Sequence, residues 1–288
     1  MASALEYAIH RVIREYDTAG ERHLGIVKTY KTIYDVYRQL KDGAEHVDLR
    51  LPWNWFTHGP VMQYRYVSPD ALQIGPSNQQ SDGEAVFRPV STGNLDAKNL
   101  PLDLRQLIDE QVAMSVSGFA KLKASQVTNK IYERYAPHPF ELSFRKLARG
   151  FEQKDLDYDE RDLALVNKVQ SEFPFEEFPE LVPLFVDWSA FMHMAIEENP
   201  KFLWDNPDIV KVFQKLYGSQ MSLRYNANVE PLVPVWKKES DALREVVQLE
   251  LSTKRWEFAP LSKVEGVTPL AAYREAVLEE LNARAGIA

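Results

Sequence analysis

Apolar residues recur every three or four positions over most of the chain, the spacing that places them on one face of an α-helix. The first such stripe contains Leu5, Ala8, Ile9, Val12, Ile13 and Tyr16. The second contains Val27, Tyr30, Ile33, Tyr34, Tyr37 and Leu40. Gly43 follows where a helix end is expected. The spacing therefore predicts two amphipathic helices at the start of the chain.

Prolines interrupt this pattern between residues 52 and 101, where six of the 17 prolines fall. Proline lacks a backbone donor and restricts the residue before it, so long helices are not expected here. Residues 61–67 and 85–90 are short and rich in β-branched and aromatic side chains, which favours strands. The polar, turn-rich residues 75–83 are predicted to form a loop between them. We expect a small antiparallel β-hairpin near residues 60–92.

Helical spacing resumes near residue 102 and continues almost to the end of the chain. Glycines at 150, 218 and 286 stand where helices are expected to end. The pattern predicts helices at residues 102–123, 125–135, 139–149, 155–173, 180–198, 207–218, 234–254 and 269–285. Together these features predict a mainly α protein, a helical bundle with one small hairpin.

Charge is segregated along this helical part of the chain. Residues 121–149 contain seven basic and two acidic residues, whereas residues 151–200 contain thirteen acidic and three basic ones. The change at Gly150 predicts an N-terminal helical domain over 1–150, including the hairpin, and a C-terminal helical region over 151–288. Two faces of a single domain would give the same pattern, so this alternative stays open.

Composition excludes several classes of protein. The chain has no cysteine, which rules out a disulfide scaffold, a cysteine nucleophile, zinc–thiolate sites and iron–sulfur clusters. Its 34 basic and 42 acidic residues give a net charge of −8, which argues against a uniformly basic surface for nucleic acid but not against a local patch. No apolar run approaches the ~18–20 residues that span a bilayer. We therefore expect a soluble, cytoplasmic protein without a membrane partner.

Motifs for catalysis and cofactors are missing from the sequence. No His pair has the zinc-hydrolase spacing, and no glycine-rich phosphate loop, dinucleotide fingerprint or nucleophile elbow is present. Asp155, Asp157 and Asp159 begin like a calcium loop, but Glu160 and Val166 stand where that loop needs Gly and Glu. We therefore predict no metal, no cofactor and no catalytic residue.

Arg134 and His138 form one weak catalytic candidate. Their R-x3-H spacing is similar to the R-x4-H spacing of all-helical ribonucleases of the HEPN type, in which a His moves protons and an Arg holds phosphate. The spacing is one residue short, and prolines flank His138. A positively charged helix end is the favoured interpretation, and a helical ribonuclease-like enzyme is kept as the weaker alternative.

The segment LPWNWFTHGPVM at residues 51–62 is the most unusual in the chain. Large aromatic side chains contribute several kcal/mol when buried, about 3–5 kcal/mol on truncation to Ala. Glycine permits close approach, and proline fixes the following turn. A packed corner between helices and hairpin is the favoured interpretation. The functional interpretation is a partner-binding surface made of Trp53, Trp55, Phe56, His58, Gly59 and Pro60.

These residues carry a family resemblance. An aromatic helix around Tyr30, Tyr34 and Tyr37, followed by an aromatic segment ending in His58-Gly59-Pro60-Val61, resembles the Panacea-type antitoxin domain, which includes SocA-like adaptors. The family has Tyr where this chain has His58. The segment is also similar to archaeal proteins with a Trp-rich Gly-Pro-Val element. The resemblance covers residues 24–140 at most. It implies a helical module that neutralises or delivers a partner protein without catalysis.

The sequence therefore leaves three classes of function open. The first is a non-enzymatic protein-interaction module, antitoxin-like or defence-associated, whose protein partner is encoded nearby. The second is a DNA- or RNA-binding protein that uses Lys121, Lys123, Lys130, Arg134, Arg145, Lys146 and Arg149. The third is the ribonuclease-like enzyme. For the second class we expect at least two of Arg145, Lys146 and Arg149 to be exposed.

Overall fold

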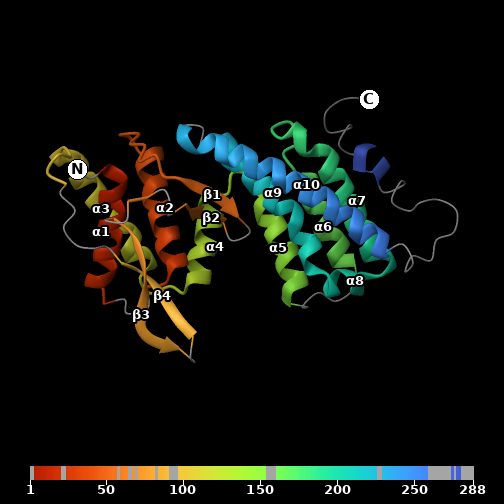
Figure 1. Ribbon diagram of the computed structural model, residues 1–288, viewed down its shortest axis with the longest axis horizontal. Helices are drawn as coiled ribbons and strands as arrows, with labels where there is room; N and C mark the ends of the chain where they lie inside the picture. The colour runs from red at the N-terminus through yellow and green to blue at the C-terminus, as the bar shows by residue number, and fades with distance from the viewer. Residues whose placement is uncertain are drawn as a thin grey trace. The chain divides into compact units, whose positions relative to one another are not determined.

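The computed structural model describes residues 3–20, 24–56, 59–63, 67–68, 71–81, 84–90, 97–153, 160–225, 229–258, 274–275 and 277–279. Most of them lie in helices, which confirms the mainly helical prediction (Figure 1). The chain divides into two compact units. Unit 1 comprises Met1–Arg134 and Asn226–Val233, and unit 2 comprises Tyr135–Tyr225 and Pro234–Ala288.

Unit 1 is built on three packed helices, α1 (Ala4–Thr18), α2 (Ile26–Asp42) and α3 (Leu102–Phe119). A capping box begins α1, because the Ser3 hydroxyl accepts from the Glu6 amide and the Glu6 carboxylate accepts from the Ser3 amide. The apolar stripe predicted for α1 is buried, whereas α2 is buried almost all round. Helix α4 (Ala124–Tyr135) and the short η3 (Glu230–Leu232) complete the helical part of this unit.

Four strands belong to unit 1. β1 (Trp53–Phe56) pairs antiparallel with β2 (Gly59–Met62), and β3 (Gln73–Ser81) pairs antiparallel with β4 (Glu84–Val90). Strand β4 matches the strand predicted at residues 85–90. Its partner is β3, which occupies most of the loop predicted at 75–83, whereas residues 61–67 were the expected partner. In both pairs the two strands are neighbours in sequence.

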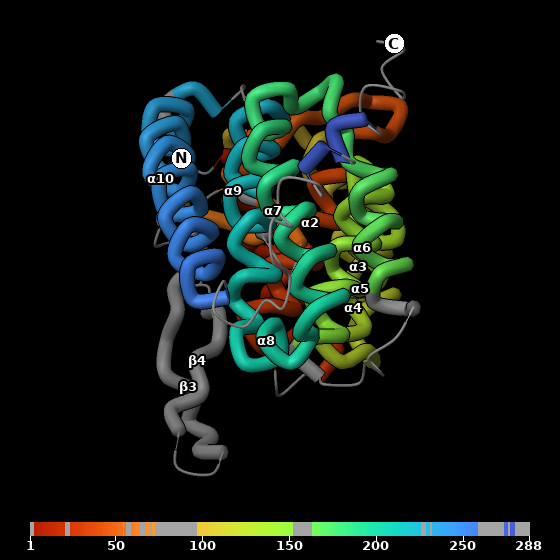
Figure 2. Tube along the Cα trace, turned by 90° about the vertical axis from the view of Figure 1, so that its right-hand side faces the viewer, coloured from red at the N-terminus to blue at the C-terminus, as the bar shows by residue number. Residues whose placement is uncertain are grey.

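Unit 2 contains α5 (Pro139–Gln153), α6 (Glu160–Glu172), η2 (Pro179–Leu181), α7 (Val182–Glu198), α8 (Pro200–Asp205), α9 (Pro207–Tyr225) and almost all of α10 (Val233–Phe258). Helices α5, α6, α7 and α9 lie side by side (Figure 2). Their core is aromatic: the Phe140 ring contacts four other rings, and Phe173 stacks on Phe185 with ring centroids 4.0 Å apart. Such contacts contribute beyond simple area burial.

The boundary between the units lies between Arg134 and Tyr135, which differs from the domain boundary predicted at Gly150. Helix α5 therefore belongs to unit 2 rather than to the N-terminal domain. Its apolar face, made of Phe140, Phe144, Leu147 and Phe151, is buried there. The change in charge at Gly150 does not follow this packing, because apolar side chains decide which elements share a core. No described helix is long and apolar enough to cross a membrane.

Candidate functional site

The two tryptophans of the predicted partner-binding segment lie in the core of unit 1. Trp53 is 3% exposed and Trp55 is 2% exposed. Edge-to-face contacts hold them, with ring centroids 5.2 Å apart for Trp53 and Tyr34 and 5.3 Å apart for Trp55 and Tyr132. The recognition-surface interpretation is therefore corrected for both tryptophans, because buried indoles offer no surface to a partner. Of the other members, Phe56 lies in β1, and His58 falls outside the described residues.

Gly59 and Pro60, which complete the predicted binding segment, are buried at the start of β2. Gly59 has a φ of +79°, and a Cβ added there would lie 3.0 Å from the Tyr132 ring and 3.3 Å from the Lys31 Nζ atom. The Lys31 ammonium in turn donates to the Pro60 carbonyl at 2.6 Å. Only glycine combines this backbone conformation with so close an approach. Gly59 therefore leaves room for the buried Lys31, and the Pro60 carbonyl accepts a hydrogen bond from its ammonium group.

Helix α2 contributes further buried charges to unit 1. The Lys28 ammonium donates to the Ala120 carbonyl at 2.7 Å. The fully buried Asp35 carboxylate accepts from Gln39 Nε2 at 2.6 Å, from Ser115 Oγ at 2.8 Å and from Arg134 Nη1 at 3.1 Å. These bonds tie α2 to α3 and α4 and compensate the burial of charge. The polar groups of α2 thus form a structural network.

The predicted nucleic-acid-binding residues fall in both units. In unit 1, Lys121 and Lys123 are exposed, Lys130 is half-buried, and Arg134 is bonded to Asp35. In unit 2, Lys146 is exposed, Arg149 is half-buried, and Arg145 is buried. The expectation that at least two of the last three are exposed is wrong, because α5 packs against α6, α8 and α9 and leaves only Lys146 of the three exposed. Among these seven, Lys121, Lys123 and Lys146 are exposed, and Arg134 is exposed but paired with Asp35.

Arg134 and His138, the ribonuclease-like pair, belong to different units. Each is held inside its own unit, Arg134 by Asp35 and His138 by two partners. The His138 Nε2 atom lies 3.0 Å from a Glu177 carboxylate oxygen and 3.1 Å from the Tyr225 hydroxyl. Burial lowers the pKa of His138, although Glu177 acts in the opposite direction. Arg134 and His138 therefore each bind other residues of their own unit.

A buried carboxylate lies beside this histidine in unit 2. Glu141 accepts from the Tyr217 hydroxyl at 2.7 Å and from the His138 backbone amide at 3.0 Å. Burial raises the pKa of Glu141 to about 7, and these hydrogen bonds oppose that rise. The network fastens the start of α5 to the end of α9. Because its pKa depends on burial, Glu141 can report on folding through the pH dependence of stability.

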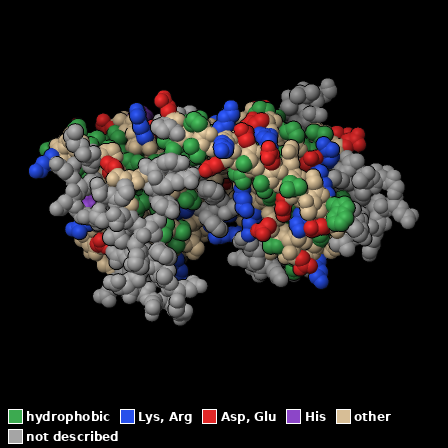
Figure 3. Space-filling view, viewed as in Figure 1, with side chains coloured by type: hydrophobic (Ala, Val, Ile, Leu, Met, Phe, Trp, Pro, Cys, Tyr) green, Lys and Arg blue, Asp and Glu red, His purple; other side chains and the backbone are tan. Residues whose placement is uncertain are grey.

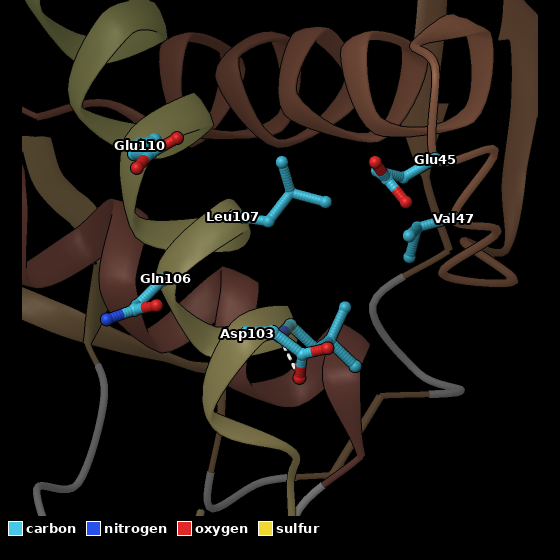
Figure 4. A pocket seen from close by; sticks show the side chains of 7 residues that line it. Glu45, Val47, Asp103, Gln106, Leu107 and Glu110 are labelled. Carbon is cyan, nitrogen blue, oxygen red and sulfur yellow. Dashed lines mark hydrogen bonds between the residues drawn. The ribbon is translucent and has the colours of Figure 1, made fainter.

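A groove on unit 1 has the features of a binding site. Helix α3 places Asp103, Leu107 and Glu110 on one face at spacings of four and three residues, and the turn after α2 supplies Glu45 and Val47. With Leu104 and Gln106 they line a cavity of about 440 Å³. Leu107 and Glu45 point toward one another across this cavity (Figure 4). We call it the α3 groove.

Both walls of the α3 groove are fixed by hydrogen bonds. On the inner side of α3, Asp109 accepts from the Tyr7 hydroxyl at 3.0 Å and from Arg11 Nε at 2.7 Å. On the turn, the Val47 amide donates to the Leu40 carbonyl at 2.9 Å, and His46 adopts a left-handed φ of 48°. A groove with such walls is preformed, so a ligand would spend little free energy on ordering it.

The groove combines negative charge with aliphatic surface. No cationic side chain among the described residues pairs with Glu45, Asp103 or Glu110. The Asp103 carboxylate accepts from the adjacent Leu104 amide at 2.9 Å (Figure 4). Met114, four residues after Glu110, continues the same helix face and is 54% exposed. A ligand that presents a cation next to an aliphatic side chain would match this lining.

Sequence reasoning did not identify the α3 groove. The spacing of Asp103, Leu107 and Glu110 is visible in the sequence and places them on one helix face. The opposite wall comes from residues 45–47, whose approach to α3 depends on the packing of α2. Within the described residues, no group of three His, Asp or Glu side chains is arranged to hold a metal ion.

Comparisons with known proteins returned no relative: no family model matches the chain, and no curated protein or solved structure is significantly similar to it.

Proposed function

We propose that the protein is an interaction module that binds a basic, partly aliphatic segment of a partner protein in the α3 groove. The observation that carries the proposal is the groove lining. Three carboxylates without cationic partners among the described residues, Glu45, Asp103 and Glu110, surround the aliphatic side chains of Val47 and Leu107. Protein interfaces use such charge complementarity for specificity and for the rate of encounter.

The chemistry of the groove suits Lys or Arg on the partner. An arginine guanidinium forms paired hydrogen bonds with a carboxylate, and a neighbouring aliphatic side chain would cover Leu107. Because Glu45, Asp103 and Glu110 lie at a solvent-facing groove, their attraction for a cation is screened by salt. Binding is therefore expected to weaken as the ionic strength rises.

A resemblance in the sequence supports a proposal for the nature of the partner. Residues 24–140 resemble the Panacea-type antitoxin domain, and this range includes every residue that lines the groove. The resemblance supports an antitoxin-like or defence-associated role in which the module neutralises or delivers a protein encoded nearby. No catalytic step is part of this proposal.

Affinity capture with matched charge reversals tests the proposal. Glu110→Lys changes the groove, and Glu133→Lys makes the same change at an exposed position of α4 outside it. We expect the wild type and Glu133→Lys to retain one basic protein from the native cells, and Glu110→Lys to bind it about tenfold more weakly, or about 1.4 kcal/mol. Equal capture by both variants would contradict the proposal.

A further inference from the structure

Helix α10 carries an apolar stripe that faces solvent. Val235, Ala242, Leu249 and Trp256 recur every seven residues, which is two helical turns, and all four are exposed. Leu249 is 70% exposed, Trp256 is 78% exposed, and Val246 lies beside them at 52%. Figure 3 shows hydrophobic side chains among both acidic and basic ones on the face of unit 2 that α10 occupies in Figure 1. We call these five residues the α10 stripe.

The α10 stripe is not the face that fastens the helix to unit 2. The opposite face is buried through Trp236, Val247, Leu251 and Phe258. The Phe258 ring contacts the rings of Phe191 and Phe202, with centroids 5.8 and 5.1 Å away. Arg244 and Arg255 also donate to backbone carbonyls of the unit at 2.8 and 2.9 Å. Since the buried face already holds α10 in place, the exposed stripe is available for a second contact.

Two glutamates border the centre of the stripe, and the exposed Lys238 lies one heptad before the first of them. Glu245 and Glu250 lie on its two sides, next to Val246 and Leu249, and neither is paired with a cation among the described residues. In heptad terms, with Leu249 at position d, Glu245 occupies a g position and Glu250 an e position. Residues at these positions choose the partner helix and its orientation.

These two glutamates argue against a second copy of the chain as the occupant. In a parallel pair of α10 helices, the g residue Glu245 would face the e residue Glu250 of the other copy. In an antiparallel pair aligned on the stripe, Glu245 would face its own counterpart. Both arrangements set like charges against each other, which destabilises the pair. A partner helix with Lys or Arg at the flanking positions meets attraction instead.

We infer that the α10 stripe docks an amphipathic helix of another protein, with aliphatic residues along its seam and Lys or Arg along both flanks. Leu249 and Trp256 supply the apolar anchors, and Glu245 and Glu250 select the basic flanks. This site lies wholly in unit 2 and does not depend on the α3 groove.

Two synthetic helices test the inference on the full chain. One peptide carries Leu at every a and d position and Lys at every e and g position, and the other replaces each Lys with Glu. All binding is measured in the Glu110→Lys background, which weakens the α3 groove as a second site for a basic, aliphatic peptide. By fluorescence anisotropy we expect the Lys peptide to bind at least tenfold more tightly than the Glu peptide. Leu249→Glu should abolish binding of the Lys peptide even though it adds negative charge. Val27→Glu, a matched change at an exposed valine of unit 1, should leave binding unchanged.

A charge reversal completes the test. In the same Glu110→Lys background, Glu245→Lys combined with Glu250→Lys should shift the preference toward the Glu peptide. Equal binding of both peptides, or binding that survives Leu249→Glu, would overturn the inference. Self-association that is lost on Leu249→Glu would overturn it in favour of a second copy. Because Glu110→Lys tests only the groove, failure at one site is distinguishable from failure at the other.

Discussion

The two units solve the same packing problem with different chemistry. Unit 1 places Lys28, Lys31 and Asp35 of α2 in its interior and satisfies each with specific partners. Unit 2 fills its interior with rings, among them Phe185 and Trp188. A charged interior depends on every partner being present, whereas an aromatic interior depends mainly on volume and shape. The stability of the two units should therefore fall by similar amounts on large truncations but by different amounts on substitutions that preserve side-chain shape.

Removing a buried tryptophan is expected to have the largest effect, and a similar one in both units. Trp55→Ala in unit 1 and Trp188→Ala in unit 2 each delete a side chain that is 2% exposed or less. We expect each to lower the free energy of unfolding by about 3–5 kcal/mol, measured by urea unfolding. A Trp55→Ala variant with wild-type stability that has lost a partner would restore the recognition-surface interpretation.

Changes that preserve shape should separate the two interiors. Asp35→Asn keeps the side-chain outline but removes the charge that Arg134 faces, and we expect a loss of about 3 kcal/mol. Phe185→Leu keeps a hydrophobic side chain and should cost less, about 1.5 kcal/mol. Asp42→Asn is the control, because its pair with Arg38 is exposed and should contribute about 1 kcal/mol at most. Equal losses for Asp35→Asn and Phe185→Leu would remove the proposed difference.

The buried Glu141 of unit 2 should make the stability of the protein depend on pH. Burial raises the pKa of Glu141 to about 7, above the value of about 4.3 in an unfolded chain. Between these pH values the folded protein keeps a proton that the unfolded chain has lost. The contribution of Glu141 to stability is therefore full below about pH 4.3 and is lost as the pH rises through 7, by up to about 3 kcal/mol.

The variant Glu141→Gln has no such titration. Relative to the wild type, its free energy of unfolding should increase from pH 5 to pH 8, because only the wild type loses stability in this range. Urea unfolding at each pH measures the difference. The exposed Glu133→Gln should follow the wild type at every pH. Parallel curves for Glu141→Gln and the wild type would show that Glu141 is ionised in the folded state throughout this range.

Substitution of Gly59 should cause the smallest of these losses of stability. Gly59→Ala forces a Cβ to within 3.0 Å of the Tyr132 ring at a left-handed backbone position. We expect a loss of about 1–3 kcal/mol in thermal or urea unfolding. The control is Gly25→Ala, where an added Cβ meets no atom within 4 Å. If both changes cost the same, Gly59 does not position Lys31.

The helices were predictable because their signal is local. The stripe from Leu5 to Tyr16 gives the buried face of α1 directly, and the density of aromatic residues near Trp55 favours a packed corner. The burial of Lys31 and Asp35 was not predictable, because lysine and aspartate normally indicate the solvent side of a helix. Contacts with residues distant in sequence, with Pro60 for Lys31 and with Ser115 and Arg134 for Asp35, help to make their burial favourable.

The candidate site was predictable only in part. One wall of the α3 groove is a single helix face with a visible spacing, but the other wall is a turn almost sixty residues earlier in the chain. For the basic residues, the sequence instead predicted an exposed site that the packing does not provide. Arg145 belongs to a local run of positive charge, yet the packing of α5 buries it, because charge sign alone does not determine which helix face meets solvent.

The most direct test of the proposed interaction maps where a basic, aliphatic ligand binds. Amide chemical shifts of the labelled full chain would be followed during titration with a short peptide of alternating Leu and Arg. We predict saturable shifts at residues 43–47 and 102–110 that weaken with added salt, need about tenfold more peptide in Glu110→Lys and are unchanged in Glu133→Lys. No shifts in these segments, or the same shifts in Glu110→Lys, would contradict it.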